Sequence, residues 1–284
     1  MPRSHTASIA TAEPEAKFPE AKLLEETMTR TTLRTIVRCA PAVLAALIVF
    51  CSWQTIVSVL HIPIVVLPPP TKVIETIHRV FPLLLKHSVP TGIEAAFGFV
   101  LSAIGGIALA IVLASSKFIR DALYPNILLF QLIPKIALAP LFIVWFGIGS
   151  TSRLCFIVFI SFFPIVLSSL AGLLSTPPEM MRLCRACSAR SIDVFIHVRF
   201  PYAVPLIFSG LKISVTFAII GVVVGEFITA QAGLGYLILF ASSQADTPLA
   251  LAAITFLCIL GLLLYGVVVG IESLVLRSLG ERRP

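Results

Sequence analysis

The stretch RSIDVFIHVRFPYAVP, residues 190–205, is charged and closed by prolines, yet it lies between two of the most apolar segments of the chain. The 284-residue chain is 58% hydrophobic and only 12% charged, with a mean hydropathy of +1.02. Because a water-soluble domain has about 25% charged residues, this composition excludes a soluble globular protein. Most of the chain therefore lies in lipid, and residues 190–205 belong to a connector between two membrane spans.

The apolar segments on either side of this connector set the number of spans. A transmembrane helix needs about 20 consecutive apolar residues. Six segments reach that length, at residues 38–60, 88–114, 122–146, 153–174, 206–229 and 248–275. We therefore predict an all-α integral membrane protein with six transmembrane helices. Three prolines in the third segment, Pro125, Pro134 and Pro140, should bend or interrupt it, because proline removes a backbone donor.

These spans divide the chain into a tail over residues 1–37 that includes a basic pre-span segment, a transmembrane domain over 38–276, and a basic tail over 277–284. Lys and Arg residues gather in the connectors on one side of the predicted spans, with fifteen on that side and four on the other. Cytoplasmic connectors carry the excess of Lys and Arg. Both termini and the connector 175–205 are therefore expected in the cytoplasm, while an amphipathic segment around residues 73–84 should lie along the opposite membrane surface.

Small residues recur at four-residue spacing in three spans, which allows close approach of helix backbones. We expect packing within the chain rather than a subunit interface from Gly98, Ser102 and Gly106, from Gly221 and Gly225, and from Gly266 and Gly270.

The opening stretch itself has the pattern of a short amphipathic helix. On a helical wheel Ile192, Phe195, Ile196 and Phe200 share one side, and Arg190, Asp193 and His197 lie on the other. Pro201 is expected to end this helix. A helix with an exposed aromatic residue in a long cytoplasmic connector can lie on anionic lipid or dock into a groove on a soluble partner, and the residues alone do not separate the two.

Three blocks carry a resemblance to a known family: PKIALAPLFIVWFGIG (134–149), EMMRLCRACSARSIDVFIHVRFPYAVPLIFSGLK (179–212) and VVVGEFITAQAGLGYLI (222–238). Together they resemble the permease subunits of binding-protein-dependent ABC importers, most closely the nitrate, sulfonate and taurine group, from Leu67 to about Gly270. The resemblance implies the type I ABC importer permease fold, a homodimer in the bacterial cytoplasmic (inner) membrane, and a cytoplasmic EAA loop that docks into an ATPase subunit. It further implies two ABC ATPase subunits, which bind ATP and Mg, and a periplasmic or lipid-anchored binding protein that delivers a small sulfonate-, taurine- or nitrate-like solute.

In this reading the docking loop supplies the residues that couple to the ATPase. They are Arg182, Arg185, Ser188, Ala189, Asp193, Phe195, His197, Arg199 and Pro201. Two of them depart from the family pattern: Arg182 stands where Glu is common, and Ser188 replaces a glycine. Ser188 is not expected to break the turn, because a serine side chain can cap the helix that follows by accepting a backbone N–H bond.

Few polar side chains lie within the predicted spans. Glu226 in the fifth span and Lys135 in the third are costly to bury in lipid, so each is a candidate for the translocation pathway, against a purely structural role. Gln131 and Lys212 also lie within predicted spans and are weaker candidates for the translocation pathway. The fourth span carries Phe156, Phe159, Phe162 and Phe163; packing is the default, with Phe159 and Phe162 as candidates for an apolar gate. Tyr236, after Gly233 and Gly235, is placed at an outer gate.

Other functions lack their residues in this sequence. There is no G-x-x-x-x-G-K-[ST] phosphate loop, so the chain is not expected to be an ATPase, and ATP must be handled by a partner. A membrane-embedded enzyme would need a clustered nucleophile, base or metal set, which the sequence lacks, so the chain is not expected to be an enzyme. The Cys184-x-x-Cys187 pair has no βαβ context to favour redox chemistry, and no basic face interleaved with aromatic residues indicates nucleic acid. The remaining alternative, a channel or secondary transporter driven by an ion gradient, predicts pairs of ionisable residues at mid-membrane.

Overall fold

The structure is a computed structural model that describes residues 41, 43–229 and 231–280, and the chain separates into two compact units, residues 1–60 and 61–284. Every regular element among the described residues is helical. In the first unit the described part contains the apolar helix Val43–Val59. It falls within the predicted span 38–60, whose first residues lie largely outside the described part.

The second unit contains four helices that are long and apolar enough to cross a membrane by themselves. They are α3 (Phe81–Ser115), α6 (Ser150–Leu174), α9 (Phe200–Thr229) and α11 (Thr247–Gly280). Each contains most or all of a predicted span, so four of the six predictions are confirmed as helices. The real helices are longer at one or both ends, and α11 includes Arg277, which the sequence placed in a tail.

The third predicted span is broken rather than continuous. It consists of α4 (Lys117–Leu132), the 3₁₀ turn η1 (Lys135–Leu138) and α5 (Ala139–Phe146), and the two parts meet at 87°. Ile133 is extended, with φ −62° and ψ 134°, because the α conformation is disfavoured directly before Pro134. Pro125 lies inside α4 without ending it. If this broken pair counts as one span, the described residues hold five.

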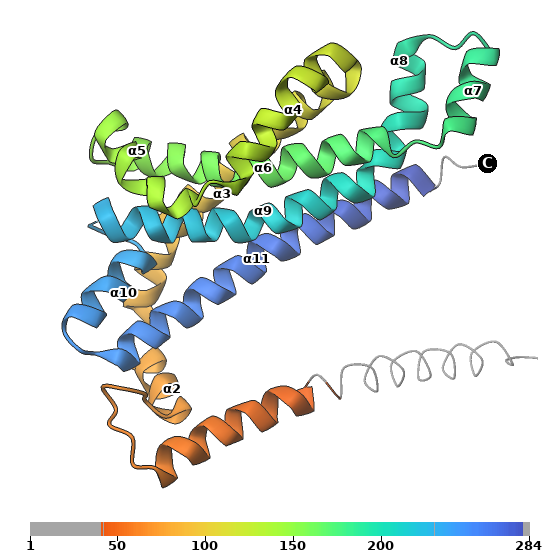
Figure 1. The fold of residues 1–284 in the computed structure, drawn as a ribbon. Helices are drawn as coiled ribbons and strands as arrows, with labels where there is room; N and C mark the ends of the chain where they lie inside the picture. The colour runs from red at the N-terminus through yellow and green to blue at the C-terminus, as the bar shows by residue number, and fades with distance from the viewer. Residues whose placement is uncertain (1–40, 42, 230, 281–284) are drawn as a thin grey trace, which may run out of the picture. The chain divides into compact units, whose positions relative to one another are not determined.

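Helix α6 packs against both α3 and α9, and α9 in turn packs against α11 (Figure 1). The close packing depends on small residues. A Cβ atom added at Gly98 would lie 2.4 Å from Ile157 on α6, and one added at Gly221 would lie 2.9 Å from Ile160. The expected intrachain packing is therefore confirmed for these glycines, whereas Gly266 and Gly270 on α11 meet open space.

Two short helices flank this bundle. Helix α2 (Pro70–Arg79) buries Val73 and Thr76 and packs against α11, as expected for an amphipathic segment. Helix α10 (Leu234–Ser243) follows α9 and packs against α11, α9 and α3. Figure 1 shows α10 at one end of α9 and the pair α7 and α8 at the other. The candidate functional residues fall at these two ends and around the break in the third span.

Candidate functional site

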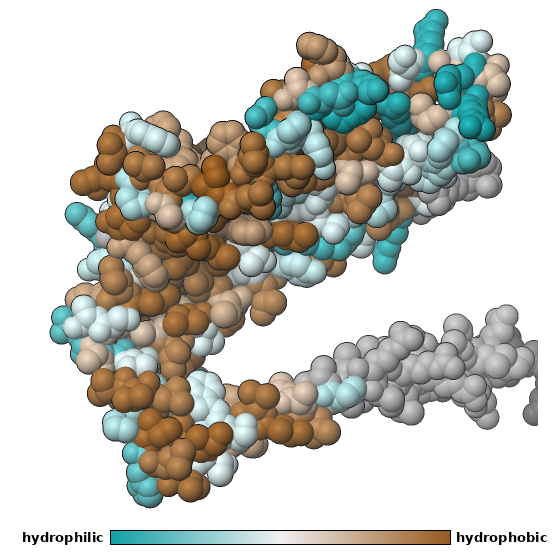
Figure 2. All heavy atoms as spheres, viewed as in Figure 1, coloured by the Kyte–Doolittle hydropathy of each residue, from teal (hydrophilic) through white to brown (hydrophobic). Residues whose placement is uncertain are grey.

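The connector between α6 and α9 folds into a helical hairpin. It consists of α7 (Pro178–Ala186) and α8 (Ser191–Val194), neither of which has a buried residue, and we refer to residues 178–194 as the α7–α8 hairpin. The two helices run side by side and project from the bundle (Figure 1). On the face shown in Figure 2, hydrophilic side chains gather at this end, while the rest of the bundle is mainly apolar. The hairpin therefore has the surface of a part that lies in water.

The turn of the hairpin is a Schellman motif centred on Ser188. The N–H of Ala189 donates to the carbonyl of Cys184 at 3.0 Å, and the N–H of Ser188 donates to the carbonyl of Arg185 at 3.0 Å. Ser188 has a φ of 50°, the left-handed conformation that glycine adopts most easily. Serine therefore keeps the turn, as expected, but not by capping, since Arg190 is the N-cap of α8 and no side chain caps that helix.

The expectation that Pro201 ends the amphipathic helix was also wrong. One helix runs from Ser191 to Thr229, through α8, the π-helical turn η2 (Phe195–Arg199) and α9. Pro201 has no N–H for the carbonyl four residues earlier, and its ring crowds that carbonyl. The π turn, in which the N–H of Phe200 donates to the carbonyl of Phe195, sits directly before the proline. The helix therefore continues, and the hairpin is joined to α9 without a loop.

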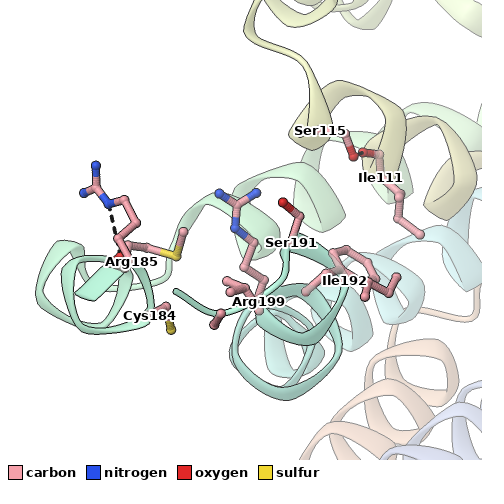
Figure 3. A pocket seen from close by; sticks show the side chains of 11 residues that line it. Ile111, Ser115, Cys184, Arg185, Ser191, Ile192 and Arg199 are labelled. Atoms are coloured by element: carbon pink, nitrogen blue, oxygen red, sulfur yellow. Dashed lines mark hydrogen bonds between the residues drawn. The ribbon is translucent and has the colours of Figure 1, made fainter. Parts of the chain in front are cut away.

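A pocket of about 620 Å³ lies between the two arms of the hairpin and the end of α3. Figure 3 shows Arg185 of α7 and Arg199 of the turn η2 that follows α8, with their guanidinium groups pointing to the same side of it. Phe195 also lines the pocket and packs against the core around α6, so it is half-buried. The exposed aromatic residue on this face of the helix is Phe200. Other predicted coupling residues are exposed: Arg182, Ala189, Asp193 and His197.

At the break in the third span the structure brings Gln131, Lys135, Phe159 and Phe162 together around one aromatic ring. The Nζ of Lys135 donates to the carbonyl of Gln131 at 2.9 Å and to its side-chain Oε1 at 3.3 Å. The same Nζ lies 5.5 Å from the centre of the Phe163 ring, within cation–π range. Phe163 in turn makes edge contacts with Phe159 and Phe162. These four candidates therefore form one cluster.

Phe159, Phe162 and Phe163 line an apolar hollow of about 620 Å³ on the surface of α6. Phe142 of α5 and Leu101 of α3 complete its wall. Lys135 is not among the residues that line this hollow, but its ammonium group lies over the ring of Phe163, which is one of them.

Glu226 and Tyr236 lie elsewhere, near the start of α10. Glu226 is only 2% exposed. Its Oε1 accepts a hydrogen bond from the hydroxyl of Thr91 at 2.7 Å, and its Oε2 accepts one from the N–H of Gly235 at 2.7 Å. Tyr236 stacks on His87 of α3 with ring centres 6.1 Å apart. The sequence-predicted pathway residues thus separate into two groups.

Two ion pairs within the spans were missed by the sequence analysis. Arg153 of α6 binds Glu94 of α3 through two N–H groups, at 2.8 and 2.5 Å, and also contacts Thr229 of α9. Lys212 of α9 pairs with Glu272 of α11 at 2.5 Å. The partners are about sixty residues apart in sequence, so no local pattern shows them. Each pair joins two neighbouring helices. This structural role explains why charged residues lie within the spans without invoking an ion pathway.

Within the described ranges no group of three or more His, Cys, Asp or Glu side chains could hold a metal ion. The long helices are apolar enough to cross a membrane, and the α7–α8 hairpin at one end of the bundle is hydrophilic. At the other end Glu226 and Thr91 form a polar contact that is buried between helices. These features define a helical membrane protein with several spans.

Comparison with known proteins gives the family. Residues 104–277 match the family described as "Binding-protein-dependent transport system inner membrane component", and the chain belongs to this family. It is therefore the non-catalytic permease subunit of a binding-protein-dependent ABC importer, a multi-pass protein of the inner membrane. ATP is handled by a partner ATPase, and a binding protein is its second kind of partner.

Curated relatives cover most of the chain. A probable ABC transporter permease protein of Haemophilus influenzae is 33% identical over 75% of this chain and 87% of its own length. The riboflavin transport system permease protein RibX of Chloroflexus aurantiacus is 34% identical over 84% and 88%. The taurine transport system permease protein TauC of Escherichia coli is 30% identical over 75% and 80%.

Solved structures with the same fold are more distant in sequence. A chain of an amino acid ABC transporter with histidines superimposes with a TM-score of 0.56 at 15% identity, over 72% of this chain and 97% of that one. A chain of the MetNI methionine ABC transporter gives a TM-score of 0.53 at 20% identity, over 69% and 96%. The described helices thus have the fold of ABC importer permeases.

Proposed function

We propose that the α7–α8 hairpin is the element that docks into the ATPase subunit, and that α6 and α9 carry the movement of the ATPase into the membrane. The observation that supports this most directly is the continuous helix from Ser191 to Thr229, which joins an exposed hairpin to a span without a flexible loop. A rigid connection of this kind transmits a displacement, whereas a loop would absorb it. The span would then rock as a body between inward-open and outward-open states.

The predicted coupling residues take different parts in this proposal. Arg182, Ala189, Asp193 and His197 are exposed and available to touch the partner. Arg185 and Arg199 present positive charge at the mouth of the pocket between the arms. A second set acts through shape: Ser188 forms the turn, Phe195 anchors the hairpin to the core, and Pro201 accompanies the π turn.

The proposed assembly contains two copies of this chain, because one hairpin serves one ATPase groove and a closed ATPase pair presents two. Each copy would have the type I permease fold with six spans, the first formed by the segment around Val43–Val59. Both termini and the hairpin would face the cytoplasm, as the distribution of Lys and Arg indicates. The oligomeric state of the purified transporter, measured by light scattering with correction for bound detergent, tests this; a stable single copy per complex would contradict it.

The cargo is proposed to be a small sulfonate-, taurine- or nitrate-like solute. Two observations support it: Lys135 places a cation beside Phe163, one of the rings that line the aromatic hollow of α6, and relatives named for taurine, aliphatic sulfonates and nitrate are among those matched. Other matched relatives are named for riboflavin and formylaminopyrimidine, which are the competing candidates for the cargo. The cargo is tested by the thermal midpoint of the cognate binding protein with taurine, an alkanesulfonate, nitrate or riboflavin. A rise with one of the first three is expected, and a rise with riboflavin alone would refute the proposal.

The docking proposal is tested by blocking the tip of the hairpin. Ala189 is exposed beside the turn, so Ala189→Trp should clash with a fitted groove whatever the charge of the partner. We expect the amount of ATPase subunit that co-purifies to fall at least about tenfold. Lys117→Trp, an equally bulky change at the exposed start of α4 in the neighbouring connector, is the matched control. Full assembly of Ala189→Trp, or equal losses for both variants, would place the docking site elsewhere.

A further inference from the structure

The buried carboxylate of Glu226 is held by neutral donors and not by a cation. The four ion pairs of the described residues do not include it, and the nearby Arg153 is engaged by Glu94. One carboxylate oxygen is bonded by Thr91 of α3 and the other by the backbone of Gly235 in α10. Glu226 itself is part of α9. Three helices therefore meet at one side chain.

Thr91 extends this contact to a second backbone group of α10. Its Oγ1 accepts a hydrogen bond from the N–H of Leu234 at 2.8 Å while its hydroxyl donates to Glu226. The N–H of Gly233 donates to the Nδ1 of His87 at 3.1 Å. Consecutive N–H groups at the start of a helix have no partner within the helix. Here three of them, from residues 233–235, are satisfied by side chains of α3 and α9.

The chain at this turn is shaped to admit the carboxylate. Gly233 has a φ of 115°, and a Cβ atom on it would lie 2.2 Å from Oε1 of Glu226. A Cβ on Gly235 would lie 2.8 Å from Oε2 and 3.1 Å from the carbonyl oxygen of Val223. Glycine at both positions therefore allows the backbone to approach Glu226 closely.

We propose that Glu226 is a positioning residue: with Thr91 it clasps the first turn of α10 to α3 and α9, so that these helices move as one body during transport. The inference rests on the proposed function, in which α9 is driven by the hairpin at its other end. Both oxygens of the carboxylate are engaged by donors of the fold and the side chain is only 2% exposed, so Glu226 is placed to join helices rather than to meet a passing solute. Helix α10 in turn packs Leu234 and Leu237 against Ala252 and Ala253 of α11, so the clasp would also bring α11 into the movement.

The clasp is tested first by amide hydrogen exchange over residues 231–243 in the purified permease. Glu226→Ala removes both acceptors, and exchange at residues 234–235 should accelerate at least about tenfold. Glu226→Gln should stay within about threefold of the parent, because its carbonyl can accept from Gly235 while its amide donates to Thr91. Thr91→Val should accelerate exchange at Leu234, and Thr91→Ser should restore it. Glu75→Ala, which removes an exposed carboxylate from α2, is the matched control.

Movement as one body is tested by the distance between spin labels at Leu85→Cys on α3 and Leu239→Cys on α10, both exposed positions. In the complex with its ATPase, this distance should be the same without nucleotide and after trapping with ATP, Mg and vanadate, and Glu226→Ala should broaden it. A distance that changes with nucleotide in the parent would overturn the one-body inference. If Glu226→Gln and Glu226→Ala accelerate amide exchange equally, the charge of Glu226 matters and not its hydrogen bonds, and the clasp is overturned. If amide exchange in Glu226→Ala stays at the parental rate, the clasp is also overturned. The exchange result does not depend on ATPase docking, so failure of the proposed function would be recognised separately.

Discussion

At the scale of single residues, Ser188 shows how a substitution can be accepted without changing the turn. The family pattern has glycine here, and the Schellman hydrogen bonds of Ala189 and Ser188 form with serine in the left-handed region. A residue with a Cβ atom in this conformation costs about 1–2 kcal/mol, part of which is recovered because glycine loses more entropy on folding. The sequence revealed the departure but not its consequence, because the capping alternative depends on a backbone angle that the letters do not give.

Ser188→Gly is therefore expected to stabilise the hairpin by about 0.5–1 kcal/mol. Amide exchange at Ala189, whose N–H bonds to Cys184, should slow by about twofold to fivefold. The same change at Ser191, in the first turn of α8, should have the opposite effect because glycine weakens a helix. Faster exchange in Ser188→Gly would show that the serine contributes something other than its backbone conformation.

At the scale of elements, the sequence indicated where the apolar helices lie but not how they end. Four spans were placed correctly because a run of about 20 apolar residues is a strong signal. The continuation through Pro201 was missed, because a proline ends most helices and the π turn that accommodates it has no sequence signature. Pro134 predicted an interruption of the third span, but the sequence did not predict the 87° angle at which its two parts meet.

Pro201→Ala tests the origin of the π turn. With a backbone N–H restored at position 201, the segment 195–199 should return to α geometry and rotate the hairpin about the axis of α9. Spin labels at Asp193→Cys and Leu206→Cys, both exposed and on opposite sides of the turn, should report a changed distance. An unchanged distance would mean that packing of Phe195 against the core, and not the proline, sets this geometry.

The Arg153–Glu94 pair is an element-scale contact because it joins α6 to α3 and reaches Thr229 of α9. Both side chains are less than a fifth exposed, so removing one partner leaves a buried charge, at a cost of about 3–5 kcal/mol. Glu94→Gln and Arg153→Gln should each lower the thermal midpoint of the purified protein more than the double variant does. Simple additivity of the two single changes would contradict a coupled pair.

At the scale of the whole molecule, the sequence predicted the membrane location and the family, whereas only the structure shows which candidate residues contact one another. Composition alone placed the chain in the membrane, and the three quoted blocks indicated the permease family to which the chain belongs. Which candidates meet could not be predicted, since Glu226 and Thr91 are 135 residues apart and Lys135, at the break in the third span, lies over Phe163 of α6. Such contacts arise from the packing of α3, α6 and α9, which a hydropathy pattern does not encode.

The central claim is that the α7–α8 hairpin faces the cytoplasm, where an ATPase can reach it. The most direct measurement is cysteine labelling in a variant whose six native cysteines are replaced, with single cysteines at His197 on the helix after the hairpin and at Glu75 on α2. A membrane-impermeant maleimide added to intact spheroplasts should label position 75 and leave position 197 unreacted until the cells are opened. Labelling of position 197 from outside would contradict the account, because no ATPase of the cytoplasm could then act on the hairpin.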